Sequence, residues 1–229
     1  MPPSGGPGGA AAHATVNFDG FGERAVDFYE GLAADNSKAY WSDHKAVYDD
    51  QIRAPMLALL AELGPEFGIG KIFRPYRDVR FSNDKSPYKT HCGAVIETPS
   101  AVFYTQLGAD GLLVAGGVYR WSTDQLARYR IAVDDERYGE DLRCVLAAAA
   151  ANGTSMQPGG DTLRSHPRGI ATDHPRIDLL RHRSLYLWRC WPPDEVIHER
   201  ACLDRVRAGW RATVPLTEWL SRHVGAAEV

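Results

Sequence analysis

The sequence lacks the features that would assign this protein to a membrane, a secretory route or a disulfide-stabilised scaffold. It contains no apolar run of about 18 residues, so no transmembrane helix is expected. Its first residues include no basic segment followed by an apolar one, so no secretory signal is expected either. The four cysteines include no C-x-x-C pair, which argues against a zinc knuckle and a disulfide framework. These absences predict a soluble, cytoplasmic protein with reduced thiols.

An excess of charge of one sign is also lacking. The net charge of −3 gives no overall attraction to nucleic acid or anionic lipid, so neither is expected as a partner, and any basic surface must be a local patch. The content of 44% hydrophobic and 24% charged residues is ordinary for a globular protein. Residues 1–15 are rich in Gly, Pro and Ala and are predicted to form a disordered tail. Residues 16–229 are predicted to form a single domain.

Two stretches near the start have the apolar spacing of amphipathic helices. In the first, large apolar side chains recur at helical intervals from Phe18 to Leu32, and the helix is expected to end at Asp35. Ser37 is placed to cap the second helix, which Pro55 is expected to kink or restart because proline lacks a backbone N–H.

Later helices have their own start signals. Ser122 followed by Gln125 is the pattern of a capping box. Further helices are expected from about Tyr138 and after Pro175, and a helix or a helix pair is expected over residues 193–224.

The middle of the chain changes to the two-residue period of strands. A hairpin is expected around Asp110-Gly111, and the pair Gly116-Gly117 inside a strand indicates a bulge or the close approach of a helix or ligand. Short connections between successive strands favour an antiparallel sheet. The predicted fold is therefore α+β, with an antiparallel sheet of about four to five strands and helices packed before and after it. The strands are expected over residues 71–81, 92–97, 101–108, 111–119 and 184–191.

The segment Lys71–His91 concentrates the unusual chemistry of the chain. Its five cations are Arg74, Arg77, Arg80, Lys85 and Lys89, and its two carboxylates are Asp78 and Asp84. Arginines fixed on a strand and lysines on the following turn could form a cradle for phosphate or carboxylate. The competing interpretation is a lattice of salt bridges that stabilises the turn. Both hold together if the carboxylates orient cations that face a ligand.

Three side chains of the same segment are candidates for proton transfer. They are Asp78, Asp84 and Tyr88, the last only if the surrounding cations lower its pKa; otherwise it packs the turn. His91 could serve as a base for a nearby serine, but no G-x-S-x-G elbow or other acyl-transfer signature is present. The sequence thus leaves open whether the protein is an enzyme.

Histidines cluster between residues 166 and 182, close to several aspartates. These histidines are His166, His174 and His182, and their spacing matches no metal-ligand motif. His174-Pro175 reads more simply as the start of a helix. No metal and no cofactor is therefore predicted.

The run from Arg77 to Thr90 also carries a family resemblance. It reads Arg-Asp-x-Arg-Phe-Ser-x-Asp-Lys-x-Pro-Tyr-Lys-Thr and resembles the hallmark of the domain of unknown function 2461. Further similarity lies in Asp35-Asn36 followed by Trp41, although Tyr40-Trp41 departs from the Trp-Phe order typical of the family. The resemblance implies a shared α+β fold and a shared site, and no reaction.

Three functions remain open at this point. The first is binding of an anionic small molecule, with or without catalysis, at the basic strand and turn. The second is a non-catalytic interaction module that docks an acidic protein or a nucleic-acid backbone, whose binding would fall steeply with salt. The third is a purely structural lattice, for which Arg80→Met would chiefly lower stability.

Overall fold

The computed structural model describes residues 17–78 and 85–228, so the tail predicted over residues 1–15 lies outside it. The helices are α1 (Ala25–Ala34), α2 (Lys38–Val47), the π-helix η1 (Tyr48–Arg53), α3 (Ala54–Phe67), α4 (Thr123–Asp134), α5 (Glu136–Ala151), α6 (Ile177–Leu180), the 3-10 helix η2 (Glu195–His198) and α7 (Ala201–His223). The strands are β1 (Gly70–Ile72), β2 (His91–Glu97), β3 (Val102–Gly108), β4 (Gly111–Val118), β5 (Gln157–Gly159) and β6 (Leu185–Trp191).

The strands form an antiparallel sheet in the order β1-β2-β3-β4-β6-β5, which confirms the predicted α+β class. The described residues give six strands, because two strands of three residues lie at the edges. One of them, β5, is not among the strands expected from the sequence. The other is β1. A strand is expected over residues 71–81, and in the described part of that range only β1 is a strand of the sheet. The chain leaves the sheet after Phe73, whose N–H still bonds to the carbonyl of Gly93, because the next residues pair with their own return segment.

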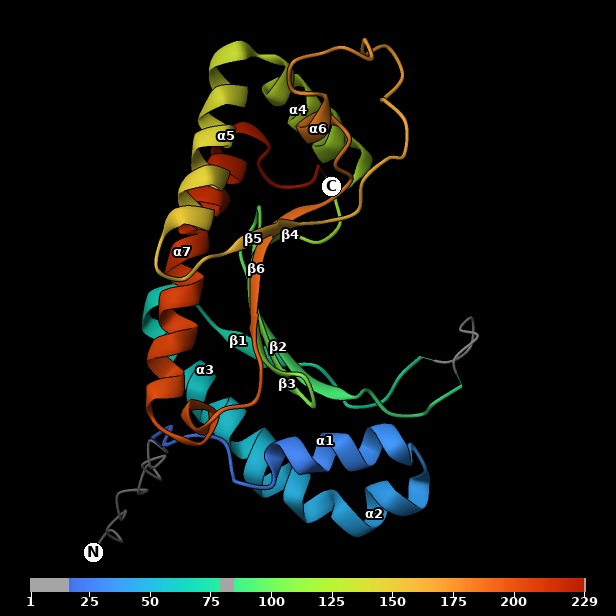
Figure 1. Cartoon of the computed structure of the whole chain (residues 1–229), viewed down its shortest axis with the longest axis vertical. Coiled ribbons are helices and arrows are strands. Elements are labelled where there is room, and N and C mark those ends of the chain that lie inside the picture. Colours follow the sequence, from blue (N-terminus) through green and yellow to red (C-terminus); the bar gives the residue numbers. More distant parts are fainter. Residues whose placement is uncertain (1–16, 79–84, 229) are drawn as a thin grey trace, which may run out of the picture.

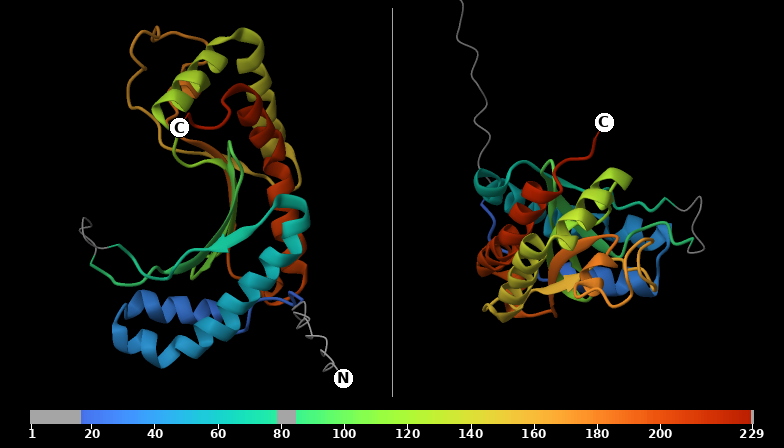
Figure 2. Two further views of the ribbon diagram at one scale, coloured as in Figure 1. Left: turned by 180° about the vertical axis from the view of Figure 1, so that it is seen from behind. Right: turned by 90° about the horizontal axis from the view of Figure 1, so that it is seen from above.

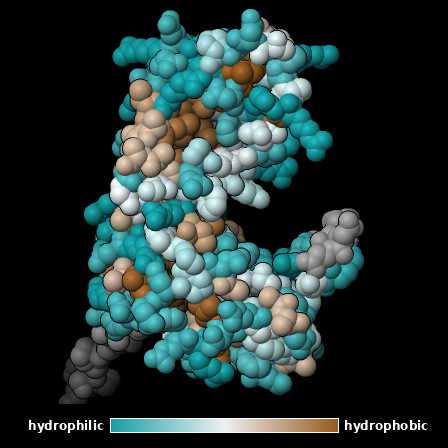
Figure 3. Space-filling view, viewed as in Figure 1, coloured by the Kyte–Doolittle hydropathy of each residue, from teal (hydrophilic) through white to brown (hydrophobic). Residues whose placement is uncertain are grey.

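That departure creates a projection from the sheet, which we call the arm, residues 73–78 and 85–90. It projects from the sheet alongside α1 and α2, whereas α4 and α6 lie at the other end of the sheet (Figures 1 and 2). Helices α3, α5 and α7 lie along one side of the sheet, and the opposite face is open. The space-filling view shows this open side hollowed between the arm and the α4–α6 end (Figure 3).

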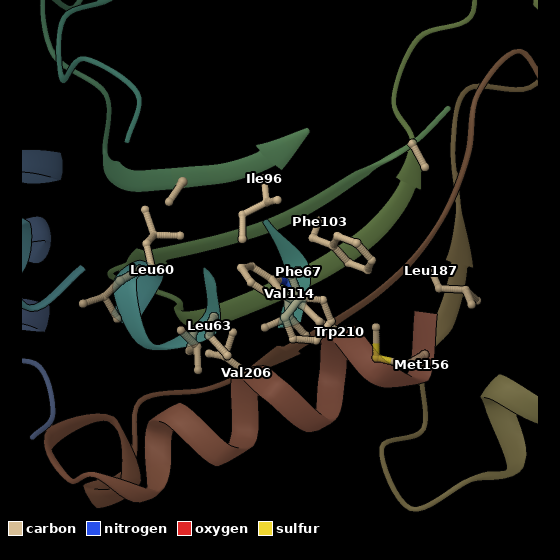
Figure 4. Close-up of a cluster of buried hydrophobic side chains, with 14 of the residues drawn as sticks. Leu60, Leu63, Phe67, Ile96, Phe103, Val114, Met156, Leu187, Val206 and Trp210 are labelled. Carbon is tan, nitrogen blue, oxygen red and sulfur yellow. The ribbon is translucent and has the colours of Figure 1, made fainter. Parts of the chain in front are cut away.

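The main core lies between the sheet and helices α3 and α7. Alternate strand residues, such as Phe103 and Leu187, point toward Trp210 of α7, and Leu63 and Phe67 of α3 complete the cluster (Figure 4). The indole N–H of Trp210, a fully buried residue, donates to the carbonyl of Tyr104 over 2.9 Å. Burying such apolar faces supplies most of the stability of helices and sheets.

Close approach of α7 to the sheet explains the Gly116-Gly117 pair. A Cβ on Gly116 would lie 2.1 Å from the Thr213 hydroxyl oxygen, so only glycine lets the helix pack at this distance. Gly117 adopts φ +139°, a conformation that other residues rarely adopt.

Local signals set the helix ends as the sequence predicted. The Ser37 hydroxyl accepts from the N–H of Tyr40, and Ser122 and Gln125 form the expected capping box. The helical segments do not end at Pro55. Instead α2 passes into the π-helix η1, and α3 begins one residue before the proline. Because a π-turn shifts the hydrogen-bonding register, it accommodates the missing N–H.

No helix in the two described ranges is both long enough and apolar enough to cross a bilayer.

Candidate anion-binding site

Antiparallel pairing within the arm brings the two halves of the basic segment together. The N–H of Arg77 donates to the carbonyl of Pro87 over 2.9 Å, and the N–H of Lys89 donates to that of Pro75 over 2.8 Å. An isolated bridge joins Tyr76 to Tyr88 between these bonds. Cations that are twelve positions apart in sequence therefore lie on adjacent segments.

The corner between α1 and α2 holds the base of the arm. The Asn36 side chain accepts from the N–H of Tyr88 over 3.0 Å and donates to the carbonyl of the same residue over 3.1 Å. The Tyr88 ring stacks on Trp41 with 4.4 Å between centroids and 7° between planes. Asn36 and Trp41, both within the resemblance described above, thus position the arm.

Two half-buried bases lie where the arm meets the sheet. The Nζ of Lys89 is 5.2 Å from the centre of the Phe73 ring, and the pKa of Lys89 is lowered by burial and then by Arg74 and Arg77. The pKa of His91 is also lowered, by burial and then by Lys89 and Arg77. Positive charge is therefore crowded at this point, and a bound anion would favour the charged form of both groups.

Polar side chains of the open sheet face lie beside these bases. The Tyr104 hydroxyl donates to Oε1 of Gln106 over 2.7 Å, which leaves the Gln106 amide to donate elsewhere. Burial is the main cause that raises the pKa of Tyr104 to about 12, so the hydroxyl keeps its proton at neutral pH. Phe73 connects the two groups, because its ring centroid is 6.3 Å from that of Tyr104. Sequence reasoning missed this pair, although the alternation of residues 101–108 places both side chains away from the core.

Arg74 takes part in a different concavity, which we call the outer hollow. It has a volume of about 400 Å³ and lies between the arm and the α2–η1–α3 rod. Arg53 and Lys45 line it as well, and sequence reasoning missed both of these cations. Lys45 pairs with Asp49, whereas Arg53 and Arg74 make no hydrogen bond or ion pair to any residue that the structure describes. Asp49 lines the hollow too, and the remaining lining residues are Trp41, Tyr48, Leu57, Ile72, Phe73, Pro75 and Tyr76.

The other predicted site residues have separate outcomes. Asp78 and Lys85 are exposed and interact with other groups, as does Arg77. Arg80 and Asp84 lie outside the described residues.

Tyr88 does not meet the condition set for a proton-transfer role. It is 5% exposed, and its pKa is raised by burial and by Tyr76 and not lowered by cations. Its environment therefore fits the alternative role of packing the base of the arm.

Two of the histidines between residues 166 and 182 each contact a different neighbouring group. His174 Nε2 is 3.1 Å from Asp134, and His182 Nδ1 is 3.0 Å from the carbonyl of Ser184. Across residues 17–78 and 85–228, no three His, Cys, Asp or Glu side chains come together as a metal site would require.

A second concavity, of about 700 Å³, lies between the C-terminal end of α5 and the surface of α7. Its two arginines, Arg207 and Arg211, form ion pairs with Asp204 and Glu66. Because carboxylates already neutralise these arginines, this surface suits an anion less well than the arm does.

Comparison with known proteins identifies a family. The model of a family described as "Conserved hypothetical protein (DUF2461)" matches residues 24–219, a range that contains the whole arm and the sheet. No curated protein matches the chain.

Proposed function

The chain belongs to the DUF2461 family of conserved hypothetical proteins, and we propose that it binds a small molecule bearing phosphate or carboxylate where the arm meets the open sheet face. The observation that carries the proposal is the gathering of Lys89, His91 and Arg77 beside Phe73, where burial first and neighbouring cations second lower the pKa of Lys89 and of His91. Such perturbed bases in a concave region are typical of functional sites.

Each group has a role in this proposal. Lys89 and Arg77 supply the charge, and His91 adds a second charge when it is protonated by the approach of the anion. The amide of Gln106 donates a hydrogen bond, and its orientation is fixed by the hydroxyl of Tyr104. A neutral donor aimed at an anion adds geometric selectivity to the electrostatic attraction.

The other sequence-predicted residues of the segment extend the same proposal. Arg80 and Lys85 remain predicted contributors to the charge that attracts the ligand. Asp78 and Asp84 remain the predicted proton-transfer groups for the case in which the ligand is chemically transformed.

A thermal-shift titration with inorganic phosphate and citrate tests the proposal. A ligand that binds only the folded state raises the melting temperature, and we expect Lys89→Met to abolish the rise. Lys71→Met is the matched control, because Lys71 is an exposed lysine of β1 that pairs with Glu97. Equal shifts in wild type and Lys89→Met would contradict the proposal, as would no shift in either protein.

A second candidate, docking of an acidic partner, is favoured by the outer hollow. Leu57 and Tyr76 are 45% and 51% exposed there, beside the cations Arg53 and Arg74. Exposed apolar groups beside clustered cations are typical of interaction surfaces. Poly-glutamate binding that falls steeply with salt and is lost in Arg53→Ala/Arg74→Ala, but not in Lys89→Met, would select this candidate. A single-stranded oligonucleotide serves as the nucleic-acid probe in the same assay.

A further inference from the structure

One edge of the sheet, continued by the arm, leaves its backbone groups unpaired. The N–H of Phe73 donates to the carbonyl of Gly93, and the carbonyl of Pro75 accepts from the N–H of Lys89. Successive residues of an antiparallel strand direct their N–H and C=O groups to opposite edges, so the residues between these positions point outward. The outward residues are Gly70, Ile72, Arg74 and Tyr76, and their backbone groups make no hydrogen bond to any described residue. We call residues 70–76 the free edge.

The protein closes the opposite edge of the arm itself. Tyr88 pairs with Tyr76 across the arm, so the backbone groups of Tyr88 point away from the free edge. The Asn36 side chain accepts from the N–H of Tyr88 and donates to its carbonyl, as a neighbouring strand would. The free edge has no such cap among residues 17–78 and 85–228. An uncapped edge is a template for pairing with another chain.

The length and charge of the free edge leave it open to pairing. Strand β1 alone has three residues, but the arm continues its edge to Tyr76, which gives it the length of an ordinary strand. Proteins often protect an edge with a charged side chain, and Lys71 is the charge available in β1. Its Nζ, however, donates to Oε2 of Glu97 over 2.8 Å. Lys71 is therefore held toward β2 and away from the free edge.

The outer hollow lies directly beside the free edge. Ile72, Arg74 and Tyr76 all line it, as alternate residues of an extended segment that present their side chains to one side. Arg53 lines the same hollow, and neither it nor Arg74 pairs with a carboxylate that the structure describes. A strand added at the free edge would direct alternate side chains into this hollow. Carboxylates at those positions would meet the two arginines.

Apolar side chains flank the same edge and also lack a cover. Ile69, the residue before β1, is 97% exposed. Leu57 and Tyr76 are exposed within the outer hollow. A partner that is only acidic would leave these groups in water, whereas one with both acidic and apolar side chains would cover them.

We infer that the free edge pairs with an extended acidic segment of a partner protein, which adds a strand beside β1 and the arm. The backbone of the segment bonds to Ile72 and to the other outward residues. Its carboxylates reach Arg53 and Arg74, and its apolar side chains cover Leu57 and Tyr76. In this mode of recognition the main-chain hydrogen bonds supply affinity and the alternate side chains supply selectivity. The inference rests on the second candidate of the proposed function, the docking of an acidic partner, and gives that partner an extended conformation.

Fluorescence anisotropy with a labelled peptide of alternating glutamate and valine tests the inference. Ile72→Pro removes the outward N–H, and proline is tolerated where the N–H of a strand residue faces away from the sheet. Ile72→Ala is the matched control, because it also loses the side chain but keeps the N–H. We expect the peptide to bind Ile72→Pro at least about tenfold more weakly than Ile72→Ala. Arg53→Ala/Arg74→Ala should lose the peptide, and Lys89→Met should bind it as the wild type does.

Two N-methylated peptides make the same test on the wild-type protein. One is methylated at every valine nitrogen and the other at every glutamate nitrogen. Only alternate N–H groups of an added strand face the free edge, so one isomer should bind at least about tenfold more weakly than the other. Equal affinity of the two isomers would overturn the inference.

The outcomes separate strand addition from acidic docking. Equal binding to Ile72→Pro and Ile72→Ala, lost in Arg53→Ala/Arg74→Ala, would overturn strand addition and keep the docking of an acidic partner. Failure of the wild type to bind either this peptide or poly-glutamate would overturn both. Binding that is lost in Lys89→Met and kept in the double arginine variant would place the peptide at the anion site, and would overturn the inference as well.

Discussion

Removal of the Asn36 side chain should release the arm without unfolding the rest of the protein. Asn36 makes two hydrogen bonds to the backbone of Tyr88, and Asn36→Ala leaves both backbone groups without that partner. A hydrogen bond of this type contributes about 1 kcal/mol, so the pair contributes about 2 kcal/mol. The stacked Trp41 remains in the variant and continues to hold the Tyr88 ring.

Hydrogen exchange followed by mass spectrometry gives the direct readout. If the arm opens locally, amides of residues 85–90 should exchange about thirtyfold faster in Asn36→Ala, which corresponds to about 2 kcal/mol. The β3–β4 hairpin serves as the internal reference and should exchange at its wild-type rate. Asn36→Asp is the matched variant, because it keeps the acceptor for the Tyr88 N–H but loses the donor to the carbonyl.

Two results would refute the reasoning. Unchanged exchange in the arm would mean that the Asn36 bonds do not hold it. Equal acceleration in the arm and in the β3–β4 hairpin would mean that the arm opens only with the whole molecule. If the arm is released locally, phosphate affinity should fall as well, because Lys89 would no longer be fixed beside the sheet.

Three further predictions concern packing, pH and thiol chemistry. Gly116→Val should destabilise the protein by about 3 kcal/mol or more in urea unfolding, because α7 must move away at Thr213. The pKa of His91 is lowered from 6.5, so the unfolded chain takes up this proton first and the free energy of unfolding should fall as pH drops below 6.5. In urea titrations at several pH values, His91→Gln should make this fall shallower. Added phosphate should oppose the fall in the wild-type protein. In the native protein a thiol reagent at neutral pH should label the exposed Cys144 quickly and the buried Cys92 only after unfolding, because burial raises the pKa of Cys92 to about 12.

The fold could be predicted where local chemistry decides the structure. Ser37 and Ser122 cap the N-terminal ends of their helices by accepting hydrogen bonds from nearby amides, and the Asp110-Gly111 turn closes a hairpin. These signals need only a few neighbouring residues. The short strand β1 and the arm could not be predicted in the same way, because alternation in residues 71–81 does not reveal which segment they pair with. That choice depends on contacts such as Asn36 with Tyr88, which are far apart in sequence.

The charges of the candidate site could be predicted from the sequence, but the surfaces on which they lie could not. The cations of residues 71–91 are evident in the sequence. The sequence does not show that Arg74 lines the outer hollow or that Lys89 lies over Phe73, close enough to Arg74 for that arginine to lower its pKa. Their neighbours come from other elements, Arg53 from η1 and Tyr104 from β3. A sequence pattern cannot show which distant side chains meet a segment that leaves its own sheet.

The π-helix η1 has a consequence for how the two halves of the molecule are joined. It makes α2 and α3 parts of one uninterrupted rod, in which Trp41 faces the arm and Leu63 faces the sheet. Each residue turns a helix by about 100°, so deleting one residue from η1 would rotate one of these faces away from its partner. The extra residue of the π-turn therefore sets the direction in which the faces of α2 and α3 point relative to each other. The helix that holds Trp41 against the arm is thus joined by a continuous helical backbone to the helix that covers the core.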